Sequence, residues 1–135
     1  MASIEQALTS RIQGDASVGA VIGDRFYPMK LPAQVTLPAA TYQKISNVPT
    51  HVHGAKAEQL RPRFQVTSWG ATFSDAMSAA NAIQTSLDGF EGTMGSGGNT
   101  KDVYSCLLAD DRHDNSPEVG LYWVQRDYFI HHIGD

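Results

Sequence analysis

The segment that decides the fold is TFSDAMSAANAIQTSLDG, residues 72–89. Thr72 is placed to cap a helix, Asp75 lies in the first turn, where a carboxylate interacts favourably with the helix dipole, and Gly89 marks the end. Because a helix with a single apolar face is unstable alone, this one must pack on a sheet. The expected apolar face is Phe73, Ala76, Met77, Ala80, Ile83 and Leu87, and the residues lying away from it are Ser74, Ser78, Asn81 and Thr85.

Two shorter helical segments are expected before this one. In SIEQALTSRIQG, residues 3–14, Ser3 and Gln6 have the spacing of a capping box. In DASVGAVIG, residues 15–23, Asp15 is the expected cap and Gly23 the expected end. The segment 25–38 carries three prolines, so we expect it to be extended and loop-like.

Strands are expected on both sides of the long helix, at residues 39–48, 61–70, 103–110 and 119–133. Pro62 cannot donate a hydrogen bond to a neighbouring strand, so it is expected at the start of its strand or on a sheet edge. The order of elements lacks the regular βαβ alternation of parallel sheets. It predicts an α+β fold: a mainly antiparallel β-sheet with an N-terminal helix and one long helix packed on one face.

The composition fits one globular domain over residues 1–135, since 41% of the residues are hydrophobic and 18% are charged. The formal net charge of −4 gives no general attraction to nucleic acid or to an anionic membrane. Neither a signal-peptide pattern nor an apolar run of membrane-spanning length is visible. Cys106 is the single cysteine, which excludes an internal disulfide. We therefore expect a soluble protein kept in a cytoplasm.

The stretch ADDRHDNSPEVG, residues 109–120, is the first place to look for catalytic chemistry. Its charged residues and imidazole could form a metal site, an acid–base pair or a solvated loop between two strands. Asp110, Asp111 and Asp114 lack the alternation and the glycine of a calcium-binding loop. Carboxylates that work as an acid–base pair usually come from separate elements, and the N-S-P that follows is turn-forming. These features favour the loop.

The other candidate residues also favour structural roles. His51 and His53 would point the same way in an extended backbone, but no second half-site for a metal accompanies them. The glycines of residues 92–98 follow a helix and precede a strand, which is the reverse of a phosphate-binding loop. Cys106 lies among apolar neighbours, as a core residue does. The sequence predicts no enzyme activity, no catalytic or metal-binding residues and no cofactor.

Four blocks in a fixed order give the sequence a family resemblance. They are R-F-Y-P followed by L-P-x-x-x-Y-Q, then F-Q-V-x-x-W, then L-D-G-F-x-G-T, and finally G-L-Y-x-V. Together they resemble the tail-completion or tail-terminator proteins of tailed phages, over about residues 4–132. The resemblance implies a small virion subunit, assembled in the host cytoplasm, that forms a ring of six on the head-proximal end of the tail tube. Such a ring stops tube polymerisation and presents a surface to the head.

The resemblance also implies partners: copies of the chain itself, the major tail tube protein and the head connector or stopper protein. DNA would pass through the lumen without specific binding. We expect the contacts on three polar connections, residues 48–59, 92–101 and 110–118, because loops on a rigid sheet can adapt to unlike partners. The candidate interface residues are Thr50, His51, His53, Lys56, Glu58, Ser96, Asn99, Lys101, Asp110, Asp111, Arg112, His113 and Asp114. Two alternatives stay open: a head-completion protein on the connector side of the joint, and a small metal-dependent hydrolase using residues 110–114.

Overall fold

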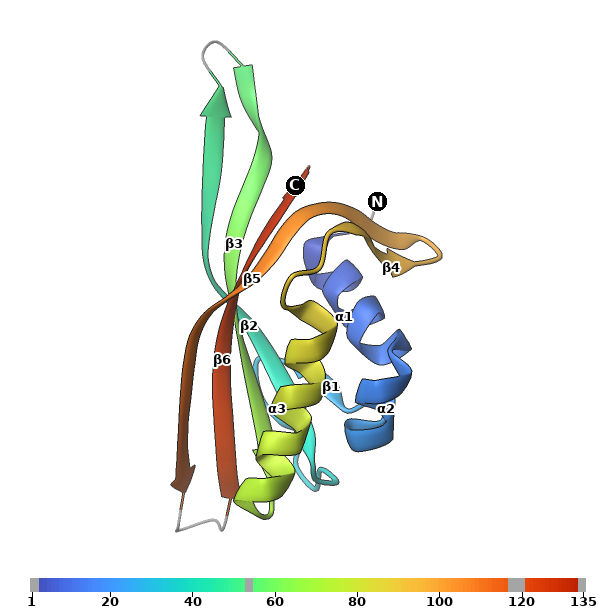
Figure 1. The fold of residues 1–135 in the computed structure, drawn as a ribbon, viewed down its shortest axis with the longest axis vertical. Coiled ribbons are helices and arrows are strands. Elements are labelled where there is room, and N and C mark those ends of the chain that lie inside the picture. The colour runs from blue at the N-terminus through green and yellow to red at the C-terminus, as the bar shows by residue number, and fades with distance from the viewer. Residues whose placement is uncertain (1–2, 53–54, 117–120, 134–135) are drawn as a thin grey trace.

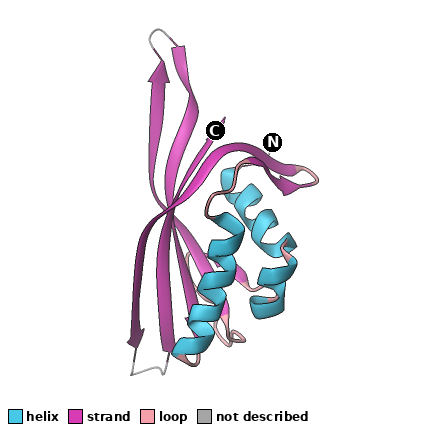
Figure 2. Cartoon of the chain, in the orientation of Figure 1, coloured by secondary structure: helices cyan, strands magenta, loops and turns pink. Residues whose placement is uncertain are grey.

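The computed structural model describes residues 3–52, 55–116 and 121–133, and in this part of the chain helices cover one face of a single sheet (Figures 1 and 2). The helices are α1 (Ile4–Gly14), α2 (Ala16–Ile22) and α3 (Phe73–Leu87). The sheet has the strand order β1-β2-β3-β6-β5-β4, with bounds β1 (Phe26–Pro28), β2 (Ala39–Val52), β3 (Ala55–Gly70), β4 (Gly92–Ser96), β5 (Asn99–Ser116) and β6 (Leu121–Ile133). Neighbouring strands are antiparallel, except that β1 and β2 are parallel. The α+β prediction is confirmed.

The helices begin at the residues that the sequence indicates. The amide of Gln6 donates to Ser3 Oγ at 3.2 Å, and Gln6 Oε1 accepts from the Ser3 amide at 2.9 Å, which completes the capping box of α1. Asp15 accepts from two amides at the start of α2. Thr72 Oγ1 accepts from the Asp75 amide at 3.1 Å and caps α3. Among the helices of the described residues, none is long and apolar enough to cross a membrane.

The core lies between the helices and the sheet. Apolar residues of α1 and α3 pack there against Phe64 and Val66 of β3 and against Tyr128 and Ile130 of β6. Of the expected apolar face of α3, Ala76, Ala80, Ile83 and Leu87 are buried and Met77 is half-buried, whereas Ser74, Ser78, Asn81 and Thr85 are exposed. The expected burial between helix and sheet is therefore confirmed for most of the face.

Phe73 is the exception to that apolar face, because 41% of its surface is exposed. It is the first residue of α3, at the end of the helix, where its ring meets His113 of β5 edge-on, with ring centroids 5.1 Å apart. A helical period places a residue on a face but does not reveal where the sheet beneath the helix ends.

The three polar connections expected to be loops are largely strand, so that prediction is wrong. β2 runs on to Val52 and β3 starts at Ala55, which places Thr50 and His51 on β2 and Lys56 and Glu58 on β3. His53 lies outside the described residues. The hairpin that these two strands form extends past the helices (Figure 1). The strands continue through this polar sequence because the two of them pair with each other along it.

The other two connections are corrected in the same way. Ser96 closes β4 opposite Asn99, and Lys101 of β5 lies opposite Met94. Gly97, between the two strands, has a φ of +61°, which favours glycine in so tight a turn. β5 then continues to Ser116 and pairs with β6 along the whole acidic stretch, so Asp110, Asp111, Arg112, His113 and Asp114 are all strand residues.

Pro62 is neither at the start of its strand nor on an edge, which corrects the second strand prediction. It is buried in the middle of β3, between β2 and β6, and lies opposite Asn47. On the β6 side the paired rows skip from Leu60–His132 to Arg63–Phe129. The proline is thus placed where the ladder to β6 is interrupted, so on that side its missing N–H removes no hydrogen bond from a paired row.

Candidate assembly surface

The sheet has a second face that the helices leave open (Figures 1 and 2). Successive side chains of a strand point to opposite faces, so the burial of Phe64, Val66 and Tyr128 under the helices assigns their odd-numbered neighbours to the open side. We call this surface the helix-free face. It consists of Arg63, Gln65, Thr67 and Trp69 of β3, Trp123, Gln125, Asp127 and Phe129 of β6, and Leu107, Asp110 and Arg112 of β5.

A buried carboxylate stands at the centre of the helix-free face. Asp127 is only 1% exposed, although no helix covers it. Arg63 donates to Asp127 Oδ2 from Nε at 2.9 Å and from Nη2 at 2.7 Å, and Arg112 Nη2 donates to Oδ1 at 3.4 Å. Asp110 accepts from Arg112 and lies 3.8 Å from Arg63 Nη2. The two guanidinium groups thus cover the carboxylate and link β3, β6 and β5 across the face.

The acidic stretch of β5 is divided between the two faces by strand alternation. Asp110 and Arg112 lie on the helix-free face, whereas Asp111 and His113 point towards α3. There Arg126 donates to Asp111 Oδ1 at 3.1 Å and to Asn81 Oδ1 at 2.9 Å. Asp110 and Arg112 therefore belong to one ion-paired group and Asp111 to another, on opposite faces of the sheet. Within the described residues, no three His, Cys, Asp or Glu side chains come together as ligands for a metal ion.

Aromatic and apolar side chains flank the charged centre of the helix-free face. Trp69 and Trp123 lie opposite each other on β3 and β6, both half-buried, and Trp69 Nε1 donates to Thr41 Oγ1 at 3.2 Å. On the other side of the centre, Phe129 lies beneath the guanidinium of Arg61 at 4.6 Å. Leu107, opposite Phe129 on β5, is 54% exposed. Half-exposed tryptophan, phenylalanine and arginine on one face of a sheet are the residue types enriched at protein–protein interfaces.

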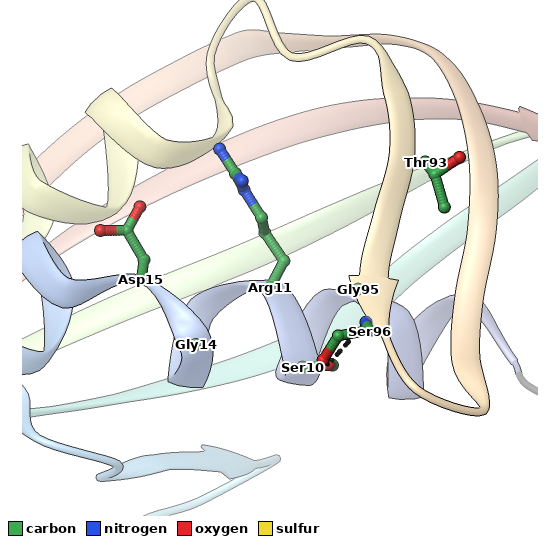
Figure 3. A pocket seen from close by; sticks show the side chains of 7 residues that line it. All are labelled: Ser10, Arg11, Gly14, Asp15, Thr93, Gly95 and Ser96. Carbon is green, nitrogen blue, oxygen red and sulfur yellow. Dashed lines mark hydrogen bonds between the residues drawn. The ribbon is translucent and has the colours of Figure 1, made fainter.

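A small groove lies on the other side of the molecule, between α1 and β4 (Figure 3). It has a volume of about 160 Å³, and a second hollow of about 560 Å³ adjoins it along α1 and reaches Asn99. Ser10 Oγ accepts from the amide of Ser96 at 3.1 Å, which fastens the β4–β5 hairpin to α1 (Figure 3). Arg11 is directed away from the groove floor, to the carbonyl of Ser86 at 3.0 Å and the ring of Phe90 at 4.5 Å. Its charge is therefore engaged in holding α1 to the end of α3.

Among the described residues, the titratable groups with displaced pKa values are Cys106, Tyr128 and Asp15, and each shift has a structural cause. Burial raises the pKa of Cys106 to about 12, and burial likewise raises the pKa of Tyr128. The Cys106 thiol is therefore neutral at physiological pH, which agrees with the prediction of a core residue and not of a nucleophile. Slight burial acts to raise the pKa of Asp15, but hydrogen bonds from the amides of Ser17 and Val18 hold it below the ordinary value.

Of the candidate interface residues whose side chains are described, Asp110 and Arg112 lie at the centre of the helix-free face. Ser96 and Asn99 border the hollows beside α1, while Thr50, His51, Lys56 and Glu58 belong to the protruding hairpin. Sequence reasoning overlooked Asp127, its partner Arg63 and the tryptophan pair. The signal was present in W-Q-D-F at alternate positions of residues 123–129, which a period of two places on one face.

Comparison with known proteins identifies the family. The model of the family "Tail completion protein gp17" matches residues 6–130. Among solved structures, the fold is similar to a chain of "Virion of native gene transfer agent (GTA) particle", with a TM-score of 0.77, 14% sequence identity, and coverage of 96% of this chain and 94% of that chain. No curated protein sequence matches. Because the family model spans nearly all of the described residues, the chain belongs to the tail completion protein gp17 family and is a structural protein of the phage tail.

Proposed function

We propose that this protein forms a closed ring of six copies on the head-proximal end of the tail tube, where it ends tube polymerisation and provides the surface that joins the head. The observation that carries the proposal, beyond the family itself, is the helix-free face: one side of the sheet carries half-exposed aromatic and apolar residues, and none of the described helices covers it. A subunit that makes heterologous contacts must close by rotation, since an open arrangement would grow into a filament.

The size of the subunit supports such a ring. The described residues expose 7279 Å². Two contacts of about 800 Å² each, the usual burial per partner, would cover about a fifth of that area. The remaining surface is large enough for the tube below and the connector above.

The three polar segments are proposed as the contacts with partners. The protruding β2–β3 hairpin, the β4–β5 turn with Ser96 and Asn99, and the strand that carries Asp110 and Arg112 lie on different parts of the molecule. A subunit that bridges unlike rings needs separate contact regions of this kind. The net charge of −4 supports a further part of the proposal: DNA passes through the lumen without being held, because 14 acidic residues outnumber 10 basic ones.

The charge network also bears on catalysis. Asp110, Asp111 and Asp127 each pair with an arginine, so these carboxylates serve to hold strands together in the arrangement described. We propose a purely structural role in the virion.

Electron microscopy of lysates tests the proposal. Disruption of the gene should give overlong tails without heads beside separate filled heads, and the intact gene should restore tails of uniform length. Tails of normal length beside unjoined heads would instead assign the protein to the connector side of the joint. Cross-linking to the major tail tube protein is expected for the proposed position, and cross-linking to the connector alone for that alternative.

A further inference from the structure

Each outer long strand of the sheet is covered along only part of its outer edge. β1 pairs with β2 at residues 40–42, and the Met29 amide donates to the Tyr42 carbonyl at 2.8 Å. From Gln43 to Val52, none of the described strands pairs with the outer side of β2. This open edge belongs to the hairpin that protrudes past the helices (Figure 1).

The outer edge of β5 is covered over the opposite part. β4 pairs with β5 at residues 99–103. The two residues that follow α3 then bond to the next part of the strand. The Gly89 amide donates to the Cys106 carbonyl at 2.7 Å, and Asp88 Oδ1 accepts from the Leu108 amide at 3.0 Å. Between Asp110 and Ser116, none of the described strands lies on the outer side of β5.

The two open edges start at the same level of the sheet and run in opposite directions from it. Asp110 lies opposite Asp127, Asp127 opposite Gln65, and Gln65 opposite Gln43. This row crosses all four long strands. The open edge of β2 extends from the row towards the protruding hairpin, and the open edge of β5 extends from it towards the start of α3 (Figure 1).

Strand direction permits these two edges to pair between copies. β2, β3, β6 and β5 alternate in direction, so the first and the last of the four are antiparallel to each other. A rotation about the ring axis places β5 of one copy beside β2 of the next in the antiparallel sense, and the alternation continues without a break. Unpaired edges of this kind present rows of N–H and C=O groups that template pairing with another chain.

We propose that residues 110–116 of β5 pair with the open edge of β2, beginning at Gln43, in the neighbouring copy. The occupant is a second copy of this chain, since the directions of the two edges are compatible, both edges start at the same level of the sheet, and the open edge of β2 is long enough to pair with the whole of residues 110–116. The inference rests on the ring of the proposed function and adds to it which edges meet. In this pairing, each copy is shifted by about six residues along the strand direction relative to its neighbour, which is roughly 20 Å at ~3.3 Å per residue.

The covering strands give this contact its geometry. If neighbouring copies were not shifted along the strands, β1 and β4 would lie between the edge of β2 and the edge of β5. The two edges can therefore pair only when neighbouring copies are shifted along the strands. Four strands span about 19 Å across a sheet, and each copy is shifted by about 20 Å along the strands relative to its neighbour. The two distances are nearly equal, so six copies can stay at one height in a closed ring only if the strands incline at roughly 45° to the ring axis. The short outer strands thus select one arrangement.

Engineered disulfides test the pairing. Cys106 is buried and would be replaced by alanine, which leaves a background without thiols. With Gln43 of one copy opposite Ser116 of the next, the bulge at Ile45 of β2 places Ser46 opposite Asp114. On assembled tails, Ser46→Cys with Asp114→Cys should oxidise into a ladder of covalent oligomers that ends at the closed ring. The matched control is Ser46→Cys with His113→Cys, whose second site faces the helices and should give at least tenfold less cross-linking.

Hydrogen exchange on the unmodified protein gives an independent test that no substitution can disturb. Amides in residues 43–49 and 110–116 should exchange at least tenfold more slowly in the assembled ring than in the free subunit. If tails end at normal length while neither edge gains protection and no ladder forms, the edge pairing is wrong and the capping function stands. If both edges gain protection in rings that leave tails overlong, the pairing stands and the capping function is wrong.

Discussion

Replacing Asp127 with alanine should destabilise the subunit much more than replacing Asp110, although both carboxylates lie on the same face. The side chain of Asp127 is 1% exposed and accepts two hydrogen bonds from Arg63. Removing one partner of a buried ion pair costs about 3–5 kcal/mol, because the other charge stays uncompensated. Arg63 is 31% exposed, so water replaces part of the lost interaction. We therefore expect a loss of about 2–3 kcal/mol.

The matched control is Asp110→Ala. The Asp110 side chain is 39% exposed and its partner Arg112 is 44% exposed, so this pair should contribute only about 0–1 kcal/mol. Urea unfolding followed by circular dichroism measures the free energy of unfolding of both variants. In thermal unfolding, the melting temperature of the Asp127→Ala variant should fall by roughly 6–12 °C. If the two variants unfold within about 0.5 kcal/mol of each other, the buried network does not hold the three strands together and the reasoning fails.

Three further predictions concern the helix start and the core. A Cβ at Gly70 would come 2.6 Å from the Ala76 amide nitrogen, so Gly70→Ala should lower the free energy of unfolding by at least about 1–3 kcal/mol. The control is Gly98→Ala, whose added Cβ would have no neighbouring atom within 4 Å and should be nearly neutral in the same urea titration. Thr72→Ala removes the cap of α3 and should cost about 1 kcal/mol in thermal unfolding; a loss no larger than that of an exposed surface substitution would argue against the cap. Burial raises the pKa of Cys106 from 9.0 to about 12, so its contribution to stability is complete below pH 9 and is lost as the pH rises towards 12. Cys106→Ala should therefore reduce the fall in urea midpoint between pH 8 and pH 10, and an unchanged fall would contradict that assignment.

The helix boundaries could be predicted from the sequence because their causes are local. A cap such as Ser3, Asp15 or Thr72 bonds amides two or three residues away, so the information lies within a few letters of sequence. The same holds for the apolar spacing of α3. Its one wrong member, Phe73, depends on the extent of the sheet, which no local pattern records.

The lengths of the strands could not be predicted because their causes are distant. Residues 110–116 have the polar composition of a loop, yet they are strand because β6 pairs with them. The central network has the same origin: Arg63 and Asp127 are 64 residues apart and meet only through the register of β3 and β6. The family resemblance supplied the role in the tail, but neither the covered and open edges nor the buried carboxylate could be read from it.

The position of β6 has a consequence for how a newly made chain matures. β6 is the last of the described strands in the chain, yet it lies inside the sheet, between β3 and β5. Until it has been synthesised, those two strands have no common neighbour and Arg63 has no Asp127 to bind. A chain released early therefore cannot present the alternating set of four strands. In the proposed ring, a chain without β6 would therefore lack the arrangement of strands that the edge pairing requires.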